Sequence, residues 1–121
     1  MSSKEKNSRY RSKIKIRKHI SGTAERPRMS VSRSLSQIYV QLIDDVAGKT
    51  LVAASSLSKD VAEELKNAKS KVDVSRMVGK LAARMAIDNN ITTVVFDRNG
   101  YRYHGRIQAV AEGAREGGLK F

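Results

Sequence analysis

Two stretches early in the chain alternate hydrophobic and polar residues, as strands do when only one face is covered. MSVSRS (29–34) sets Met29, Val31 and Arg33 against serines, and QIYVQLI (37–43) has a hydrophobic residue at every second position. We expect these two strands to be joined by a turn over 35–36. A loop containing Gly48, which can take positive φ, then leads to a third strand, TLVAAS (50–55). The pattern predicts a three-stranded antiparallel meander.

Hydrophobic residues at helical spacing follow the meander. A serine cap and an amphipathic pattern predict a helix over 58–68, and a second helix over 74–90. Gly79 inside the second helix indicates close packing against a neighbouring element. A final helix is expected from about residue 106 to 116, stopped by Gly117.

ITTVVF (91–96) is a β-branched run without polar alternation, which predicts a central strand covered on both faces. Leu119 and Phe121 can fold back to seal the end of the final helix. Together the elements predict an α/β fold: a small mixed sheet, made of the antiparallel meander plus one further strand and covered by about three helices. We expect residues 26–121 to form one domain and residues 1–25 a basic extension, mobile when free.

The charge changes this picture, because 24 Lys and Arg against 12 Asp and Glu give a net charge of +12. Residues 1–33 hold 11 basic and 2 acidic residues, a net of +9, whereas 34–95 carry +1 and 96–121 carry +2. Such an excess favours a polyanionic partner. Within the extension, the few apolar residues fit helical and strand spacing equally well.

The absence of cysteine from the sequence excludes disulfides and thiolate metal sites. No apolar run reaches the length of a membrane span, and no signal peptide is evident, so we expect a soluble cytoplasmic protein without a membrane partner.

Asp97 and His104 could form an acid–base pair, but no poised nucleophile, third metal ligand or phosphate-binding glycine loop accompanies them. The only other histidine is His19. We therefore expect no enzyme, no catalytic residue, no metal, no cofactor and no small-molecule substrate.

The stretch FDRNGYRYHGR (96–106) interleaves three arginines with two tyrosines and a histidine around two glycines. Guanidinium groups hold phosphates, aromatic rings stack on unpaired bases, and glycine allows close backbone approach. The alternative is that Asn99-Gly100 is a turn whose aromatic neighbours only cover a sheet edge. With the nearby charge, RNA binding is favoured, and RNA is preferred to DNA because no helix carries a recognition face.

FDRNGYRYHGR, AREGGLKF (114–121) and GTAERPRMSVSRSLSQIYVQLIDD (22–45) closely resemble the bacterial ribosomal large-subunit protein eighteen family. The resemblance covers residues 22–121 and the basic character of the extension. It implies a structural ribosomal protein that binds 5S rRNA and joins it to 23S rRNA in the central protuberance, beside the ribosomal protein five family. The alternative function is a general RNA- or DNA-binding compaction or chaperone protein.

The resemblance and the charge pattern together give a set of expected RNA-binding residues, drawn from the extension, the first two strands with their turn, and the 98–106 stretch. They are Arg9, Arg11, Lys13, Lys15, Arg17, Lys18, Arg26, Arg28, Arg33, Ser34, Gln37, Tyr39, Arg98, Asn99, Tyr101, Arg102, Tyr103, His104 and Arg106.

Overall fold

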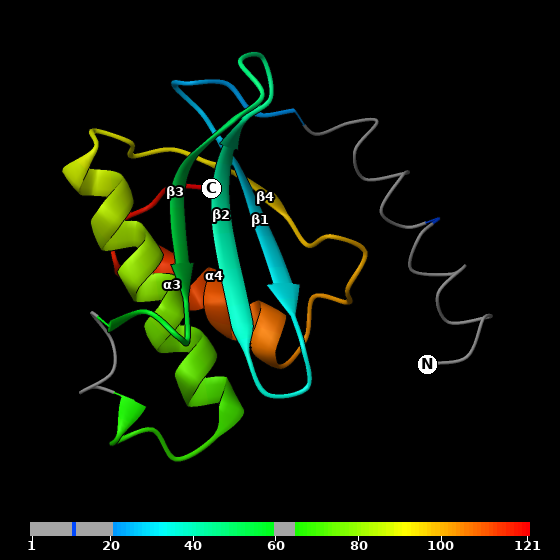
Figure 1. Cartoon of the computed structure of the whole chain (residues 1–121), viewed down its shortest axis with the longest axis vertical. Coiled ribbons are helices and arrows are strands. Elements are labelled where there is room, and N and C mark those ends of the chain that lie inside the picture. The colour runs from blue at the N-terminus through cyan, green and yellow to red at the C-terminus, as the bar shows by residue number, and fades with distance from the viewer. Residues whose placement is uncertain (1–10, 12–20, 60–64) are drawn as a thin grey trace.

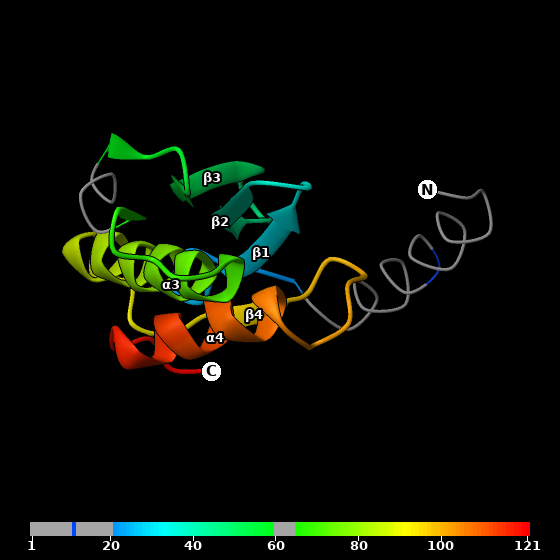
Figure 2. The ribbon, with the colours of Figure 1, turned by 90° about the horizontal axis from the view of Figure 1, so that it is seen from below.

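A four-stranded sheet with helices packed on one of its faces makes up the two layers of the structure (Figures 1 and 2). This computed structural model describes Arg11, residues 21–59 and residues 65–121. Its elements, in chain order, are β1 (Arg28–Arg33), β2 (Ile38–Asp44), β3 (Lys49–Ser55), α3 (Lys71–Asp88), β4 (Val95–Asp97) and α4 (Arg106–Glu116). The predicted α/β class is confirmed.

The strands lie in the order β3-β2-β1-β4. β1, β2 and β3 pair antiparallel, with Val31 opposite Val40 and Val40 opposite Ala54, and β4 pairs parallel to β1. The predicted meander and the mixed character of the sheet are therefore confirmed. Because β1 and β4 run parallel, both lead the chain toward the same end of the sheet.

The prediction that 91–96 forms a central strand is wrong. Only Val95–Asp97 is a strand, and it lies at the edge of the sheet next to β1. The preceding residues of the apolar run, 91–94, are covered in another way: the C-terminal segment lies beside them, where the Val94 N–H donates to the Lys120 carbonyl at 3.1 Å and the Lys120 N–H donates to the Thr92 carbonyl at 3.0 Å. A continuous apolar run records burial, which a covering segment provides as well as a neighbouring strand does.

Alternate residues of the meander form the sheet side of the core, as their spacing predicts. These buried side chains are Met29, Val31, Ile38, Val40, Leu42, Val52 and Ala54. The predicted C-terminal seal is also confirmed, since Leu119 is buried and the Phe121 ring stacks on Phe96 with 5.6 Å between ring centroids.

The two helices approach each other at glycines. A Cβ added to Gly79 of α3 would lie 2.2 Å from the carbonyl oxygen of Val110, and one added to Gly113 of α4 would lie 2.1 Å from that of Arg76. Real carbon–oxygen contacts are far longer, so no side chain fits at either position. The close packing predicted for Gly79 is confirmed, and the α3 and α4 boundaries agree with the predicted second and final helices.

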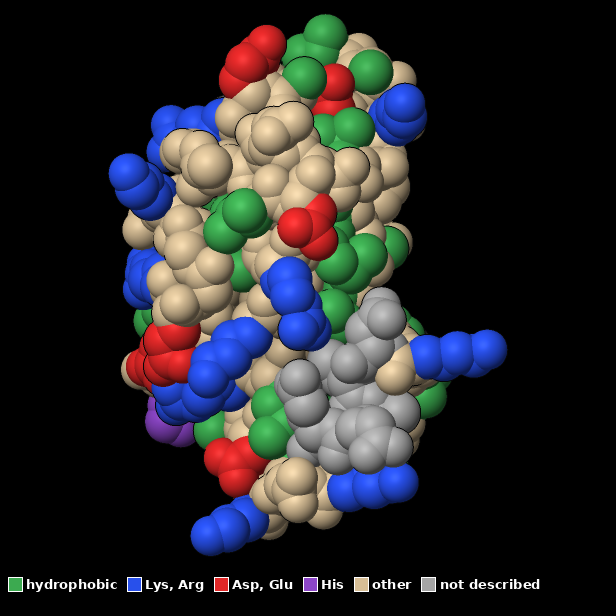
Figure 3. Space-filling model, turned by 90° about the vertical axis from the view of Figure 1, so that its left-hand side faces the viewer, with side chains coloured by type: hydrophobic (Ala, Val, Ile, Leu, Met, Phe, Trp, Pro, Cys, Tyr) green, Lys and Arg blue, Asp and Glu red, His purple; other side chains and the backbone are tan. Residues whose placement is uncertain are grey.

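The outer side of α3 carries basic and acidic groups side by side (Figure 3). Arg76 bridges to Glu112 and Glu116 of α4 at 3.0 and 2.8 Å, and Lys80 reaches Glu116 at 3.2 Å. Each pair is solvent-exposed, and surface ion pairs of this kind contribute little to stability. They do change the surface charge, because Glu112 and Glu116 neutralise the positive charge of Arg76 and Lys80 between the two helices.

Two predictions fall on parts of the chain that lie outside the described residues. Of the basic extension, 1–25, only Arg11 and 21–25 are described, and the helix expected over 58–68 includes 60–64, which are not. The third helix, the extension and the boundary between 1–25 and 26–121 therefore stay predictions.

Candidate nucleic-acid interface

The loop after β4 is a turn with a defined conformation. Asn99 and Gly100 both have positive φ, 55° and 80°, and the Tyr101 N–H donates to the Arg98 carbonyl at 3.0 Å. This confirms the turn indicated by Asn99-Gly100. The Asp97 carboxylate accepts from the Asn99 N–H at 2.8 Å, so it holds the loop's shape as a short polar side chain before a turn commonly does.

Asp97 is also the partner of Arg28. It is fully buried, and Arg28 Nη1 donates to its Oδ2 at 2.8 Å, while Arg28 Nε donates to Asp45 Oδ2 at 3.0 Å. The hydrogen bond to Asp45 raises the pKa of Arg28 most; burial opposes it, and the bond to Asp97 adds to it. Arg28, expected to contact RNA, is thus 8% exposed and committed to two carboxylates, and we assign it to positioning the loop.

Tyr101 joins the loop to the end of β1. Its hydroxyl donates to the Arg33 carbonyl at 3.2 Å, and the Arg33 guanidinium carbon lies 5.0 Å from the centre of its ring. A guanidinium at this distance from an aromatic face is attracted to it. The contact brings two expected RNA-binding residues together across 68 positions of the chain.

Arg106, at the start of α4, braces the turn between β1 and β2. Its Nη1 donates to the Ser34 carbonyl at 2.9 Å and its Nη2 donates to the Gln37 carbonyl at 2.8 Å. Ser34 and Gln37 also close the turn on themselves, with the Ser34 N–H donating to the Gln37 carbonyl at 2.9 Å. The pKa of Arg106 is lowered, first by burial and then by the positive charge of Arg33. Most of this guanidinium therefore serves the protein backbone.

Two aromatic side chains of the predicted set are partly open to solvent. Tyr103 is 44% exposed; its ring meets the edge of Phe96 at 5.9 Å between centroids, and its hydroxyl accepts from Arg115 Nη1 at 3.3 Å. Tyr39 is 37% exposed on the sheet face away from the helices. Partly exposed aromatic rings suit base stacking.

The structure divides the expected RNA-binding residues by exposure. Arg11, Arg26, Arg33, Ser34, Tyr39, Arg102, Tyr103 and His104 are exposed; Gln37, Arg98, Tyr101 and Arg106 are intermediate; and Arg28 and Asn99 are buried. Arg9, Lys13, Lys15, Arg17 and Lys18 lie outside the described residues.

Most of the described candidates gather at one end of the sheet, and Arg26 and Arg28 do not. Arg26 precedes β1 and Arg28 begins it, so the strand separates both from Arg33, at which it ends. Gln37 is also partly engaged, since the hydroxyl of Ser56 donates to its side-chain carbonyl oxygen. The cluster at the Arg33 end therefore consists of the 98–106 loop and the turn that Arg106 braces.

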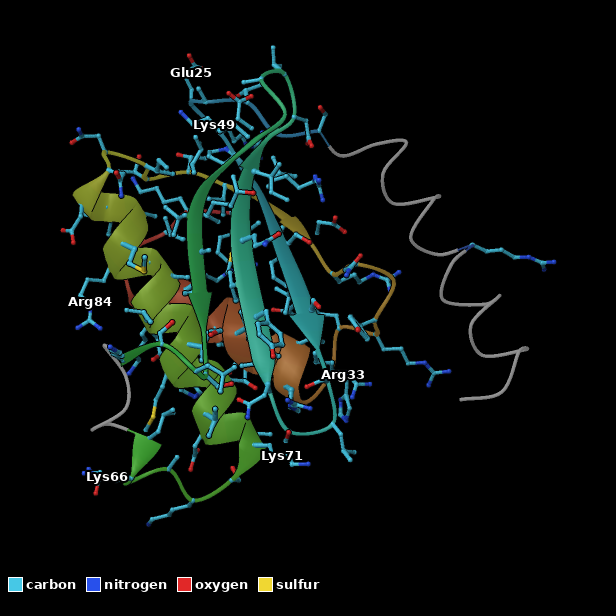
Figure 4. All side chains as sticks on the ribbon, viewed as in Figure 1. Glu25, Arg33, Lys49, Lys66, Lys71 and Arg84 are labelled. Atoms are coloured by element: carbon cyan, nitrogen blue, oxygen red, sulfur yellow. The ribbon has the colours of Figure 1, made fainter. Side chains whose placement is uncertain are left out.

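A cavity of about 620 Å³ opens beside this cluster. Its lining comes from β1, the start of α3, the loop and the start of α4: Arg33, Ser70, Lys71, Val72, Gly100, Tyr101, Arg102, His104, Gly105, Arg106 and Ile107. Arg33 and Lys71 lie at the same end of the molecule, whereas Glu25 and Lys49 lie at the other (Figure 4).

Sequence reasoning missed Ser70, Lys71 and Val72. Lys71 Nζ donates to the Leu35 carbonyl at 2.7 Å, so the start of α3 also braces the β1–β2 turn. The only local signal was Ser70 as a helix cap, which accepts from the Asp73 N–H at 3.2 Å. Nothing in the sequence connects this cap to the distant 98–106 loop.

The suspected acid–base pair has unlike surroundings, because Asp97 is buried and bonded to Arg28 whereas His104 is exposed. Within the described part of the chain, no three His, Cys, Asp or Glu side chains are grouped so as to hold a metal ion. Among the same residues, no helix has the length and apolarity needed to cross a membrane.

Comparison with known proteins gives consistent matches over most or all of the chain. The sequence model of the family described as ribosomal L18 of archaea, bacteria, mitochondria and chloroplasts matches residues 3–121. The large ribosomal subunit protein uL18 of Chloroherpeton thalassium is 62% identical over 122 residues, covering 100% of both chains. The proteins of the same name from Alkaliphilus oremlandii and Bacteroides thetaiotaomicron are each 58% identical, covering 88% and 93% of this chain and 87% and 94% of their own.

Proposed function

The chain belongs to the ribosomal L18 family of archaea, bacteria, mitochondria and chloroplasts, and on that premise we propose that it binds 5S rRNA in the large ribosomal subunit. There it serves as a structural protein. It attaches 5S rRNA to 23S rRNA in the central protuberance, next to the ribosomal protein five family. This structural role in the large ribosomal subunit is carried out in the cytoplasm and requires no cofactor or small-molecule substrate.

The observation that carries the proposal is the braced loop at the Arg33 end of the sheet. Asp97, Tyr101 and Arg106 each fix part of it through bonds to the rest of the domain. Arg102, Tyr103 and His104 are exposed on it. A preorganised loop loses little conformational freedom on binding, so its exposed groups can recognise the shape of a folded RNA.

The proposed contacts follow from exposure and engagement. Arg33 and Arg102 hold phosphates, Tyr103 and Tyr39 stack on unpaired bases, and the extension follows the RNA backbone. Arg98 is half-buried and its Nη1 donates to the Tyr101 carbonyl at 2.6 Å, so only the rest of its guanidinium is offered to a phosphate. Arg28, Asn99 and Arg106 position these groups without being primary contacts, because their polar atoms face the protein.

The net charge of +12 favours a second candidate, a general RNA- or DNA-compaction or chaperone protein. A competition titration separates the two: labelled 5S rRNA is displaced by unlabelled 5S rRNA, by unrelated RNA and by duplex DNA, at several salt concentrations. We expect 5S rRNA to compete at least tenfold better than the others at physiological salt. Equal competition by all three would establish the general polyanion binder.

A further inference from the structure

All of the described charged side chains that line the cavity beside the loop are basic. Arg33, Lys71, Arg102 and Arg106 surround it, and none of its described lining residues is Asp or Glu. The contrast with the outer side of α3 is clear, because there Glu112 and Glu116 neutralise the basic side chains. A concave site with one sign of charge concentrates ligands of the opposite sign.

Two of these cations keep hydrogen-bond donors that the described residues do not engage. The Arg102 guanidinium is exposed and forms no hydrogen bond or ion pair with the described residues. Arg106 Nε is buried without a hydrogen-bond partner in the same part of the chain. The positive charge of Arg33 lowers the pKa of Arg106, second to the effect of burial. An anion at the cavity would relieve this repulsion between neighbouring guanidinium groups.

The walls of the cavity are suited to more than a bare anion. Val72, Tyr101 and Ile107 provide aliphatic and aromatic surface, and Gly100 and Gly105 carry no side chain that would fill it. The volume of about 620 Å³ lies within the range of roughly 300–1,000 Å³ typical of organic ligands. A flat, partly apolar group attached to a phosphate matches both the walls and the charge.

We propose that this cavity holds a single unpaired nucleotide of the bound RNA, with the base against Val72 and Tyr101 and the phosphate at Arg33 and Arg102. Lys71 serves the site indirectly by holding the β1–β2 turn through the Leu35 carbonyl. The inference rests on the proposed RNA-binding function and adds to it a pocket for one nucleotide. It also makes the start of α3 part of the interface. Bases that leave a helix are bound in this manner, by stacking and by contacts to the attached phosphate.

The test fills the cavity without changing its charge. Val72→Trp places an indole at a lining position that is 39% exposed, and Val46→Trp places the same group on a turn that is 81% exposed and away from the cavity. Both full-length variants are titrated with 5S rRNA and with unrelated RNA. The bases protected in each complex are mapped with a base-modifying reagent.

We expect Val72→Trp to weaken 5S rRNA binding about tenfold, as the loss of one stacked base does, and to leave binding of unrelated RNA unchanged. One unpaired base protected in the wild-type complex should become reactive, with the rest of the footprint retained. Val46→Trp should behave as wild type. Melting curves establish that both variants are folded.

Unchanged 5S rRNA affinity and footprint in Val72→Trp would overturn the pocket and leave the proposed function intact. A wild-type protein that does not prefer 5S rRNA would overturn both. If Val72→Trp unfolds, the wild-type footprint decides, because the absence of any protected unpaired base contradicts the pocket.

Discussion

The Arg28 guanidinium donates to the fully buried carboxylate of Asp97 at 2.8 Å, across 69 positions of the chain. The same carboxylate accepts from the Asn99 N–H, so one buried ion pair connects the start of β1 to the turn at the head of the 98–106 loop. Arg28 therefore holds the loop that carries the candidate RNA contacts in place. The sequence had predicted that Arg28 would itself contact RNA.

Replacing Arg28 with Met should destabilise the fold by roughly 3–5 kcal/mol, because the buried Asp97 carboxylate would lose the hydrogen-bonded positive charge of Arg28. Urea unfolding followed by circular dichroism measures the change. Arg102→Met is the matched control: its guanidinium is exposed, and its loss should change stability by no more than about 0.5 kcal/mol. Similar stabilities for the two variants would contradict the structural role of the ion pair.

Tyr103→Ala should weaken binding to 5S rRNA by about 1–3 kcal/mol, the range found when a stacking partner is removed, and weaken binding to a duplex of equal length much less. Tyr103→Phe is the control, since it keeps the ring and removes only the hydroxyl that accepts from Arg115. Parallel titrations provide the measurement. Equal losses of affinity for 5S rRNA and for the duplex would show that Tyr103 only covers the edge of the sheet.

Gly79→Ala should destabilise the protein by about 1–3 kcal/mol, because its new methyl group would lie 2.2 Å from the Val110 carbonyl oxygen at the α3–α4 crossing. Gly48→Asn is the comparison: nothing lies within 4 Å of a Cβ there, and Asn tolerates its φ of +65°. Thermal melting of the two variants checks the difference. A tolerated Gly79→Ala would mean that the helices can separate at little cost.

Deleting residues 2–20 removes eight Lys and Arg. If the extension binds phosphates, the slope of log K against log salt should shrink by roughly 0.7–0.9 for each phosphate that the shortened protein no longer neutralises. Affinities for 5S rRNA measured from low to physiological salt give the slope. An unchanged slope would show that the extension does not neutralise phosphates.

Glu116 gives a pH prediction. Its pKa is lowered, first by the hydrogen bond from Lys80 and also by that from Arg76, although burial acts in the opposite direction. A carboxyl with a depressed folded-state pKa adds stability above its unfolded pKa and loses it as the pH falls through the folded value. Glu116→Gln should therefore flatten the acid side of the stability curve, with a small change at neutral pH because the group is exposed. Unfolding curves from pH 7 down to pH 3 test this, and parallel acid limbs would contradict it.

The chain by itself determined those features whose causes lie within a few residues. Alternation in β1 and β2 predicted the core face of the meander, and glycine placement predicted the close helix crossing at Gly79. The Asn99-Gly100 pair predicted its turn because positive φ is a property of those residues themselves. The excess of basic residues and the three motifs indicated an RNA-binding family member.

Only the tertiary structure decided what depends on segments far apart in the chain. It put β4 at the edge of the sheet, turned Arg28 and Arg106 toward the protein, and brought Lys71 to the Leu35 carbonyl. An apolar run or an arginine has the same sequence signature whether its partner is a strand, a carboxylate or an RNA phosphate. The partner is chosen by packing, which joins positions 36 to 72 residues apart and leaves a cationic cavity where four elements meet.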